Sequence, residues 1–309
     1  MPDLSPFSLP GRFWRGNLHT HSSLSDGARP LEATVRAYQE AGYDFVQLSE
    51  HFTARYRWPI ADTRQWRSNT FTTLIGAELH APATSAGELW HILATGLPHE
   101  FEPAAKHESG PELAKRAAAA GAFVGIAHPA WSQLTLDDGR AIASAHAVEI
   151  YNHGCAVETD RGDGWYLLDQ LLGPDRRLGA FATDDAHFKT DDAFGGWVQV
   201  RADALDPATL LEALKNGQYY SSQGPQIHEL SLDGDELTIG CSPVNAISVM
   251  GNNSRTVGRF GRAITGATVR LADLEKSWVE VQRSPWLRIA VIDAAGKRAW
   301  TNPIWRDEL

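Results

Sequence analysis

Amphipathic stretches and short apolar runs alternate through the first two thirds of the chain. In residues 30–41, Leu31, Val35 and Tyr38 recur at the spacing that places side chains on one face of a helix. Pro30 suits the first turn of this helix, because its missing N–H would have no intrahelical partner there. Similar patterns predict further helices at residues 111–120, 137–145, 164–172 and 207–216.

The apolar runs between these helices predict about seven strands. They lie at residues 16–18, 43–49, 72–77, 92–96, 122–127, 147–151 and 178–182. Continuous apolar strands that alternate with helices are typical of a parallel sheet buried on both faces. At this length a closed α/β barrel is favoured over an open sheet.

Beyond about residue 225 the pattern changes to short alternating strands. Residues 228–232 and 236–240 flank a turn at 233–235, and residues 286–293 and 297–301 flank a second turn. Both pairs are typical of antiparallel hairpins. We therefore predict two domains, a barrel at 1–224 and a small antiparallel β-sandwich domain at 225–309.

Composition and charge restrict the classes of function. The 309 residues are 43% hydrophobic and 21% charged, which is an ordinary globular composition. The net charge of −10 argues against binding of duplex nucleic acid. It leaves room for a small anionic substrate, because bound metal ions can outweigh a distant surface charge.

The chain lacks the sequence signals of membrane insertion and secretion. We expect neither a signal peptide nor a membrane span, since no stretch approaches the roughly 18 apolar residues that a span needs. Cys155 and Cys241 are far apart and predict no disulfide framework, so a cytoplasmic location is expected.

Residue types that can bind metals lie at the ends of most predicted strands. They are His19, His21, Asp26, His51, Glu78, His91, His128, His153, Asp185 and His187. In a parallel barrel such ends meet at one face, where active sites lie. Clustered carboxylates repel one another, and burial removes the solvation of each charged group unless cations bind the cluster. The pattern predicts two or three divalent ions, with zinc, manganese and iron all acceptable to these ligands.

The remaining histidines are predicted to be structural, because a lone histidine near a strand end more often packs than binds metal. They include His80, His99, His107, His146 and His228.

Seven motifs occur together in residues 14–223. They are NLHTHSSLSDG (17–27), LSEHF (48–52), GAE (76–78), HILATG (91–96), AHP (127–129), EIYN (149–152) and TDDAHF (183–188). This part of the chain resembles the polymerase and histidinol phosphatase (PHP) family of metal-dependent hydrolases. The segments GQYYSSQGP (217–225) and WTNPIW (300–305) resemble the carbaryl-hydrolase-like branch, in which a β domain follows the barrel.

The resemblance implies a distorted (β/α)7 barrel with a trinuclear metal site. It implies the first-metal ligands His19, His21, Glu78 and Asp185, with Glu78 as a bridge. It implies His91 and His128 for the second metal, and Asp26, His51 and His187 for the third. The sequence departs from the family at Glu50, where the family usually has Asp. Either Asn152 or His153 could fill the position where the family often has His or Cys.

The leading hypothesis is a phosphoesterase in which a metal-activated hydroxide attacks a small phosphorylated substrate. Besides Glu78, the candidate catalytic residues are Glu50 and His153, which could orient the water or protonate the leaving group. Glu50 could instead support a ligand histidine. Candidate substrate-binding residues are Asn152, Arg55, Lys189 and Trp131.

Two other functions are compatible with the sequence. The same metals could hydrolyse a carboxylic ester, carbamate or amide. Alternatively, the chain could be a non-catalytic module in which Trp286, Trp300 and Trp305 form a binding surface on the β domain.

Overall fold

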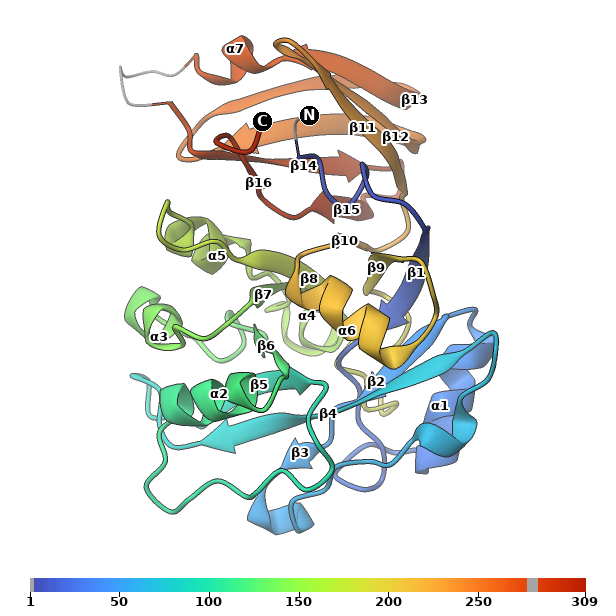
Figure 1. The fold of residues 1–309 in the computed structure, drawn as a ribbon, viewed down its shortest axis with the longest axis vertical. Coiled ribbons are helices and arrows are strands. Elements are labelled where there is room, and N and C mark those ends of the chain that lie inside the picture. Colours follow the sequence, from blue (N-terminus) through green and yellow to red (C-terminus); the bar gives the residue numbers. More distant parts are fainter. Residues whose placement is uncertain (1–2, 277–282) are drawn as a thin grey trace.

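The computed structural model describes residues 3–276 and 283–309 (Figure 1). The first part of the chain forms the strands β1 (Arg12–Asn17), β2 (Phe45–Leu48), β3 (His51–Phe52), β4 (Thr72–Ala81), β5 (Trp90–Thr95), β6 (Phe123–Ile126), β7 (Ala147–Asn152), β8 (Gly179–Thr183), β9 (Trp197–Ala202) and β10 (Tyr219–Ser222). The later strands are β11 (Ile227–Asp233), β12 (Glu236–Gly251), β13 (Thr256–Arg270), β14 (Trp286–Ile292), β15 (Arg298–Thr301) and β16 (Ile304–Trp305).

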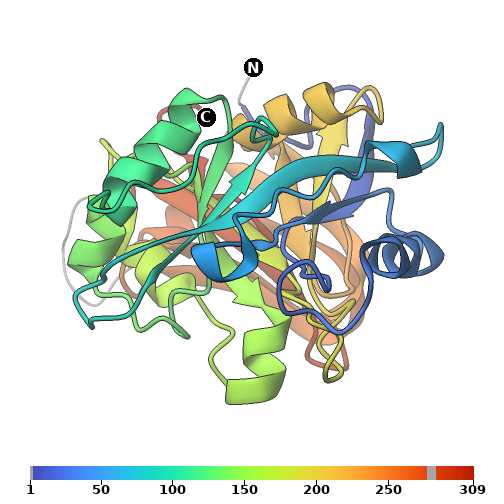
Figure 2. The ribbon, with the colours of Figure 1, turned by 90° about the horizontal axis from the view of Figure 1, so that it is seen from below.

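Six of the described helices lie around the outside of the first ten strands, with α1 and α2 on opposite sides (Figure 2). They are α1 (Leu31–Glu40), α2 (Gly110–Ala119), α3 (Leu136–Ala141), α4 (His153–Thr159), α5 (Trp165–Leu171) and α6 (Pro207–Lys215), with short 3-10 turns η1 (Ala54–Tyr56) and η2 (Arg64–Trp66). The short helix α7 (Leu271–Leu274) packs on the C-terminal strands β12 and β13. The prediction for residues 30–41 is confirmed by α1, which buries Val35 and Tyr38 on its inner face. The pattern missed α4 and β9.

The strands form one mixed sheet in the order β11-β12-β14-β15-β10-β9-β1-β2-β4-β5-β6-β7-β8. β1, β2 and β4 are parallel neighbours, and so are β6, β7 and β8. The predicted uniformly parallel sheet is wrong at two places. β5 runs antiparallel to β4 and β6, and β9 runs antiparallel to β1 and β10.

Apart from the short strand β3, the first ten strands surround a common buried core. Leu18, which follows β1, packs in one cluster with side chains from every strand from β2 to β10 except β3. The members include Phe45, Leu74, Leu93, Phe123, Ala147, Phe181, Val198 and Tyr219. Contributions from so many strands to one cluster indicate a sheet that curves around its core, as in a barrel.

Backbone groups at the edge of β8 form hydrogen bonds with side chains instead of with the backbone of a neighbouring strand. Ser221 on β10 accepts a hydrogen bond from the Ala182 N–H and donates one to the Ala180 carbonyl, each at 2.9 Å. Asn302 Oδ1 accepts from the Ala180 N–H at 2.7 Å. Because buried backbone groups need partners, these side chains fix β8 beside β10. Closure of the barrel by a continuous ladder stays a prediction.

The C-terminal strands lie above the α/β part in Figure 1 and are antiparallel. The two predicted hairpins are confirmed by β11–β12 and by β14–β15. β15 also pairs with β10, so the C-terminal strands continue the same sheet. The division at residues 224 and 225 stays a prediction.

Trp286, Trp300 and Trp305 are buried, with exposed fractions of 1%, 5% and 6%. The alternative prediction that these three rings form a binding surface is therefore wrong. They pack in the interior of the molecule, as most large apolar side chains do. In the described part of the chain no helix is long and apolar enough to cross a bilayer.

A side chain at Gly16 in β1 is expected to destabilise the protein. It lies opposite Phe45 of β2, and a Cβ added at Gly16 would lie 2.0 Å from the Phe45 ring. Because that ring is fully buried, Gly16→Ala should lower the free energy of unfolding by about 1–3 kcal/mol. Gly173→Ala, where an added Cβ meets nothing within 4 Å, is the matched control. Equal denaturation midpoints for the two variants would contradict the expectation.

Candidate metal centre

The ligand residues predicted from the sequence meet at one end of the curved sheet. Six of the strands, β1, β2, β4, β6, β7 and β8, bring their carboxyl ends to this face. β5 is antiparallel, so its first residues lie there instead, and this explains why His91 stands at the start of its strand. Register pairs His91 with His80 across β4 and β5. The reversal of β5 therefore brings to this face a predicted ligand that a parallel strand would place at the opposite end.

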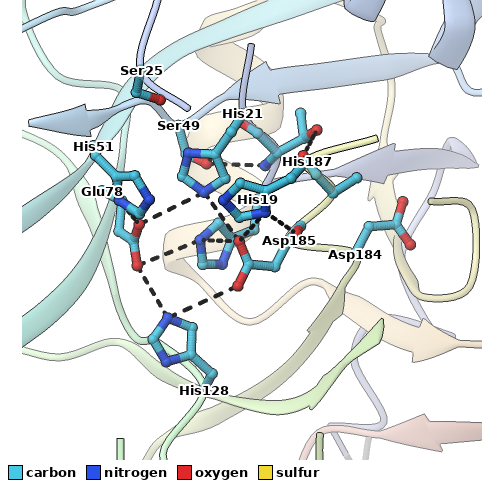
Figure 3. Close-up of polar contacts among 12 residues, drawn as sticks. His19, His21, Ser25, Ser49, His51, Glu78, His128, Asp184, Asp185 and His187 are labelled. Carbon is cyan, nitrogen blue, oxygen red and sulfur yellow. Dashed lines mark hydrogen bonds and ion pairs between the residues drawn. The ribbon is translucent and has the colours of Figure 1, made fainter. Parts of the chain in front are cut away.

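Glu78 is joined to several histidines of the group (Figure 3). Its Oε1 atom is 2.7 Å from His91 Nδ1 and 3.1 Å from His128 Nε2. Its Oε2 atom is 2.7 Å from His51 Nδ1. His19 Nε2 lies 3.6 Å from Oε1. A single buried carboxylate thus faces imidazoles from four separate segments, as expected of a bridging ligand.

Asp185 is the second buried carboxylate of the centre. Its Oδ1 atom lies 3.0 Å from His21 Nε2 and 3.2 Å from His19 Nε2. The backbone φ of Asp185 is +56°, in the left-handed region that non-glycine residues seldom adopt. His128 also has a positive φ, of +22°. Strained backbone of this kind concentrates at functional sites.

Asp26 forms the outer part of the centre. Its Oδ1 atom is 3.3 Å from His51 Nε2 and 3.2 Å from His187 Nε2. The ring of His21 stacks between those of His51 and His187, with ring centres 4.3 and 4.4 Å away. The three residues predicted for a third metal are thus brought together.

The donor set fits divalent metal ions. Within the described residues, the buried atoms His21 Nδ1 and His80 Nδ1 make no hydrogen bond. Leaving such an atom unpaired costs about 1–3 kcal/mol, so each of the two needs another partner. Imidazole nitrogens and carboxylate oxygens are ligands of zinc, manganese and iron.

Among the residues that the structure describes, four sets of side chains could each hold a metal ion, because within each set the ligand atoms lie within 4.8 Å of one another. They are His21, Asp26, His51 and His187; His51, Glu78, His80 and His91; His19, His21 and Asp185; and His19, Glu78 and His128. All nine residues predicted as ligands belong to these sets. The additional member is His80, which the sequence reasoning assigned to packing.

The carboxylates and imidazoles shift one another's ionisation. Burial opposes ionisation of Glu78, but the rings of His91, His51 and His19 hold the pKa of its carboxyl well below the usual value. Burial also opposes protonation of His51, but Glu78 and Asp26 raise its pKa to about 10. The metal-free centre is therefore a network of ion pairs.

Metal binding is expected to release protons. Despite burial, nearby carboxylates raise the pKa of three further rings, His19, His128 and His187. Like His51, these rings are shifted toward the protonated form, and any proton they hold must be lost to bind an ion. Burial lowers the pKa of His21 to about 3 and that of His91 to about 4, so these two already lack it.

The apparent affinity for zinc should consequently rise with pH up to about pH 10, the pKa of His51. Calorimetric titrations at pH 7 in buffers of low and high ionisation enthalpy should give different heats, because the buffer takes up the released protons. Equal heats in both buffers would contradict the expectation.

Glu149 supports three parts of the centre and was missed by the sequence reasoning. Its Oε1 atom lies 3.1 Å from His19 Nδ1 and also accepts a hydrogen bond from the Thr183 hydroxyl. Its Oε2 atom accepts from the His128 N–H at 2.6 Å and from Asn152 Nδ2 at 3.0 Å. A charged residue inside the apolar run of β7 is the signal that could have found it, since a buried charge needs partners.

Asn152 is placed behind the ligands. Its Nδ2 group also donates to Asp185 Oδ2 at 3.0 Å, and its Oδ1 atom accepts from the Cys155 N–H at the start of α4. With both ends of the amide engaged, Asn152 positions Asp185. The neighbouring Asp184 is turned away from the centre (Figure 3) and accepts from the Tyr38 hydroxyl.

A cavity of about 290 Å³ opens beside the centre. Its wall includes Trp131 and Lys189, two of the predicted substrate-binding residues, together with Cys155 and Glu158. Trp131 is 40% exposed and lies edge-on to the His91 and His128 rings. Lys189 Nζ is 3.3 Å from Asp26 Oδ2. The cavity thus places an aromatic face and a cation next to the ligand cluster.

Glu50 holds the loop that carries Asp26. Its Oε1 atom accepts from the Ser22 N–H at 3.0 Å, and its Oε2 atom accepts from the Ser25 hydroxyl. Burial raises the pKa of the Glu50 carboxyl, although these hydrogen bonds oppose the rise. These contacts favour a positioning role for Glu50 over proton transfer.

The structure does not bring His153 or Arg55 to the centre. His153 Nδ1 is 2.9 Å from the Tyr151 hydroxyl, and its ring lies against Gly195. Arg55 lies in η1 with its guanidinium 5.3 Å from the centre of the Tyr56 ring. Neither residue lines the described cavity.

The fold is shared with a solved structure. A two-domain protein from Bacteroides vulgatus, containing a predicted PHP-like metal-dependent phosphoesterase, aligns with a TM-score of 0.51 and 17% sequence identity over 93% of this chain and 94% of that chain. A candidate metal-dependent phosphoesterase from Bifidobacterium adolescentis aligns with a TM-score of 0.41 and 15% identity over 60% of this chain and 89% of that chain. No protein-family model and no curated protein matches the sequence.

Proposed function

We propose that the protein is a metal-dependent hydrolase of the PHP type that cleaves a small phosphorylated substrate. The observation that carries the proposal is the convergence of six histidines on the three carboxylates Glu78, Asp185 and Asp26, which together are the nine predicted ligands. The fold shared with the Bacteroides protein is consistent with it. Membership of the carbaryl-hydrolase-like branch and a cytoplasmic location stay predictions.

Two or three divalent ions would be held at this centre by the four sets of side chains described above. When bound, such ions supply a water of lowered pKa and positive charge for phosphoryl oxygens. Glu78 belongs to two of these sets, so it would help to hold more than one ion. Glu149 and Asn152 hold His19, His128 and Asp185 in place.

The cavity residues bind and orient the substrate. Lys189 can leave Asp26 and contact a phosphate oxygen, because its side chain is 49% exposed. Trp131 shields the His91 and His128 rings on one side and offers its exposed surface to the leaving group. The carboxylates Asp26, Glu78, Glu158 and Asp185 also line the cavity. An anionic substrate therefore depends on the bound ions for its charge balance.

A release assay tests this function. The protein loaded with manganese or zinc is assayed with phosphomonoesters and phosphodiesters, and the expected result is hydrolysis that a chelator abolishes. If every phosphoester is inert while an aryl ester or a carbamate is hydrolysed with the same metal dependence, the protein is instead a metal-dependent hydrolase of carboxylic esters, carbamates or amides. A protein that binds no divalent ion would overturn both.

A further inference from the structure

His80 lies in the metal centre although no sequence motif includes it. It follows Glu78 by two residues on β4, so both side chains point to the same face of the strand. Its register partner on the antiparallel strand β5 is His91, and their ring centres are 4.3 Å apart. The His80 side chain is 5% exposed. Position and burial thus bring it among the ligands.

The contacts of His80 are unusual for a packing residue. Its Nε2 atom lies 3.0 Å from His51 Nδ1 and 3.6 Å from Glu78 Oε2. Its Nδ1 atom is buried and makes no hydrogen bond to any described residue. Two imidazole nitrogens can face each other at 3.0 Å when one carries a proton or when both point at a cation.

We propose that His80 is a metal ligand, in a position formed by His51, Glu78, His80 and His91. The inference rests on the proposed function, since it assumes that the centre binds divalent ions. Ligand atoms bound at about 2.0–2.2 Å from one ion lie about 3–3.5 Å from one another. The contacts of 2.7, 3.0 and 3.6 Å among His51 Nδ1, Glu78 Oε2 and His80 Nε2 are near this spacing.

His80 changes which metal the position prefers. Three imidazoles and one carboxylate make a nitrogen-rich set, which suits zinc better than manganese. Without His80 the set has one nitrogen fewer. The chain therefore carries, in addition to the nine ligands predicted from its sequence, a side chain that selects for zinc at one position.

A supporting role through His51 is the alternative. His80 would then accept a hydrogen bond from His51 Nδ1 and fix the orientation of that ring. Loss of such a partner typically lowers metal affinity by about 10–100-fold and leaves the number of coordinated nitrogens unchanged. A ligand role changes that number, so the two roles can be separated by spectroscopy.

The test compares His80→Gln with the wild-type protein, both stripped of metal and titrated with cobalt and zinc. His91→Gln is the positive control, and His228→Gln on the exposed part of β11 is the negative control. We expect His80→Gln to lower zinc affinity at one position by more than about 100-fold, and manganese affinity by less. X-ray absorption should count fewer nitrogen ligands per zinc, and the cobalt absorption bands should change.

Equal nitrogen counts and superimposable cobalt spectra for His80→Gln and wild type would overturn the inference, while the proposed function would stand. A wild-type protein that binds no divalent ion would instead overturn the proposed function. If His80→Gln does not fold, crystals of the zinc-loaded wild type decide. Zinc within bonding distance of a His80 nitrogen supports the inference, and zinc elsewhere in the centre with His80 unbound overturns it.

Discussion

Glu78→Gln is expected to reduce hydrolysis by about a thousandfold or more, the largest effect of any single substitution in the centre. Both oxygens of Glu78 contact ligand histidines, with His91 and His51 each at 2.7 Å. An amide has the same shape but lacks the charge, and one end of it donates where an oxygen accepted. The positions on either side of Glu78 would therefore lose affinity together.

The prediction is checked by measuring turnover and bound metal in the same preparation. Glu88→Gln, an exposed glutamate in the segment between β4 and β5, is the matched control and should retain both. The account would be contradicted if Glu78→Gln folded, bound its full complement of ions and kept wild-type turnover.

Glu149→Gln is expected to lower the free energy of unfolding by about 3–5 kcal/mol, because Glu149 is fully buried and its partners would be left unpaired. Its two oxygens accept from the Thr183 hydroxyl, the His128 N–H and Asn152 Nδ2, and they also face His19. A glutamine must turn an NH₂ group toward some of these donors. Metal affinity should also fall by about 10–100-fold, because the orientation of His19 and His128 is lost.

Chemical denaturation of the metal-free protein separates the stability effect from the loss of metal. Glu32→Gln provides the comparison. Glu32 forms an exposed ion pair with Arg36, and such pairs contribute only about 0.2–1 kcal/mol to the free energy of unfolding. Similar midpoints for the two variants would show that the contacts of Glu149 do not support the fold.

Most of the candidate ligands could be predicted because they stand near one end of an apolar run. Glu78 directly follows the run at 72–77, Asp185 lies shortly after the run at 178–182, and the observed strands β4 and β8 bring them to one face. The direction of β5 could not be predicted in the same way. The apolar pattern of β5 is the same for a parallel and an antiparallel strand. Its antiparallel pairing with β4 and β6 places His91 at the end of the sheet where the other candidate ligands lie.

The supporting residues were harder to find, since their partners are distant in sequence. Glu50 and Ser22 are 28 residues apart, and Glu149 and His19 are 130 apart. His80 illustrates the same difficulty, because a histidine near a strand end reads as a packing residue until His51 and His91 are placed beside it. Local pattern identifies strand ends, and tertiary structure determines which polar groups meet there.

The continuity of the sheet is also a tertiary property. β10 and β15 pair although about 80 residues separate them, and Ser221 joins β10 to β8 through its side chain. The hydrophobic pattern locates both hairpins of the C-terminal part but contains no signal for these contacts. Pairing across so long a separation depends on the core beneath the strands.

Anomalous diffraction at the zinc absorption edge, from crystals of the zinc-loaded protein, tests most directly whether ions draw these side chains together. The account predicts separate peaks at the centre, with Glu78 and Asp185 oxygens and the surrounding imidazole nitrogens at about 2.0–2.2 Å from them. Saturating zinc with no anomalous peak among these side chains would contradict it.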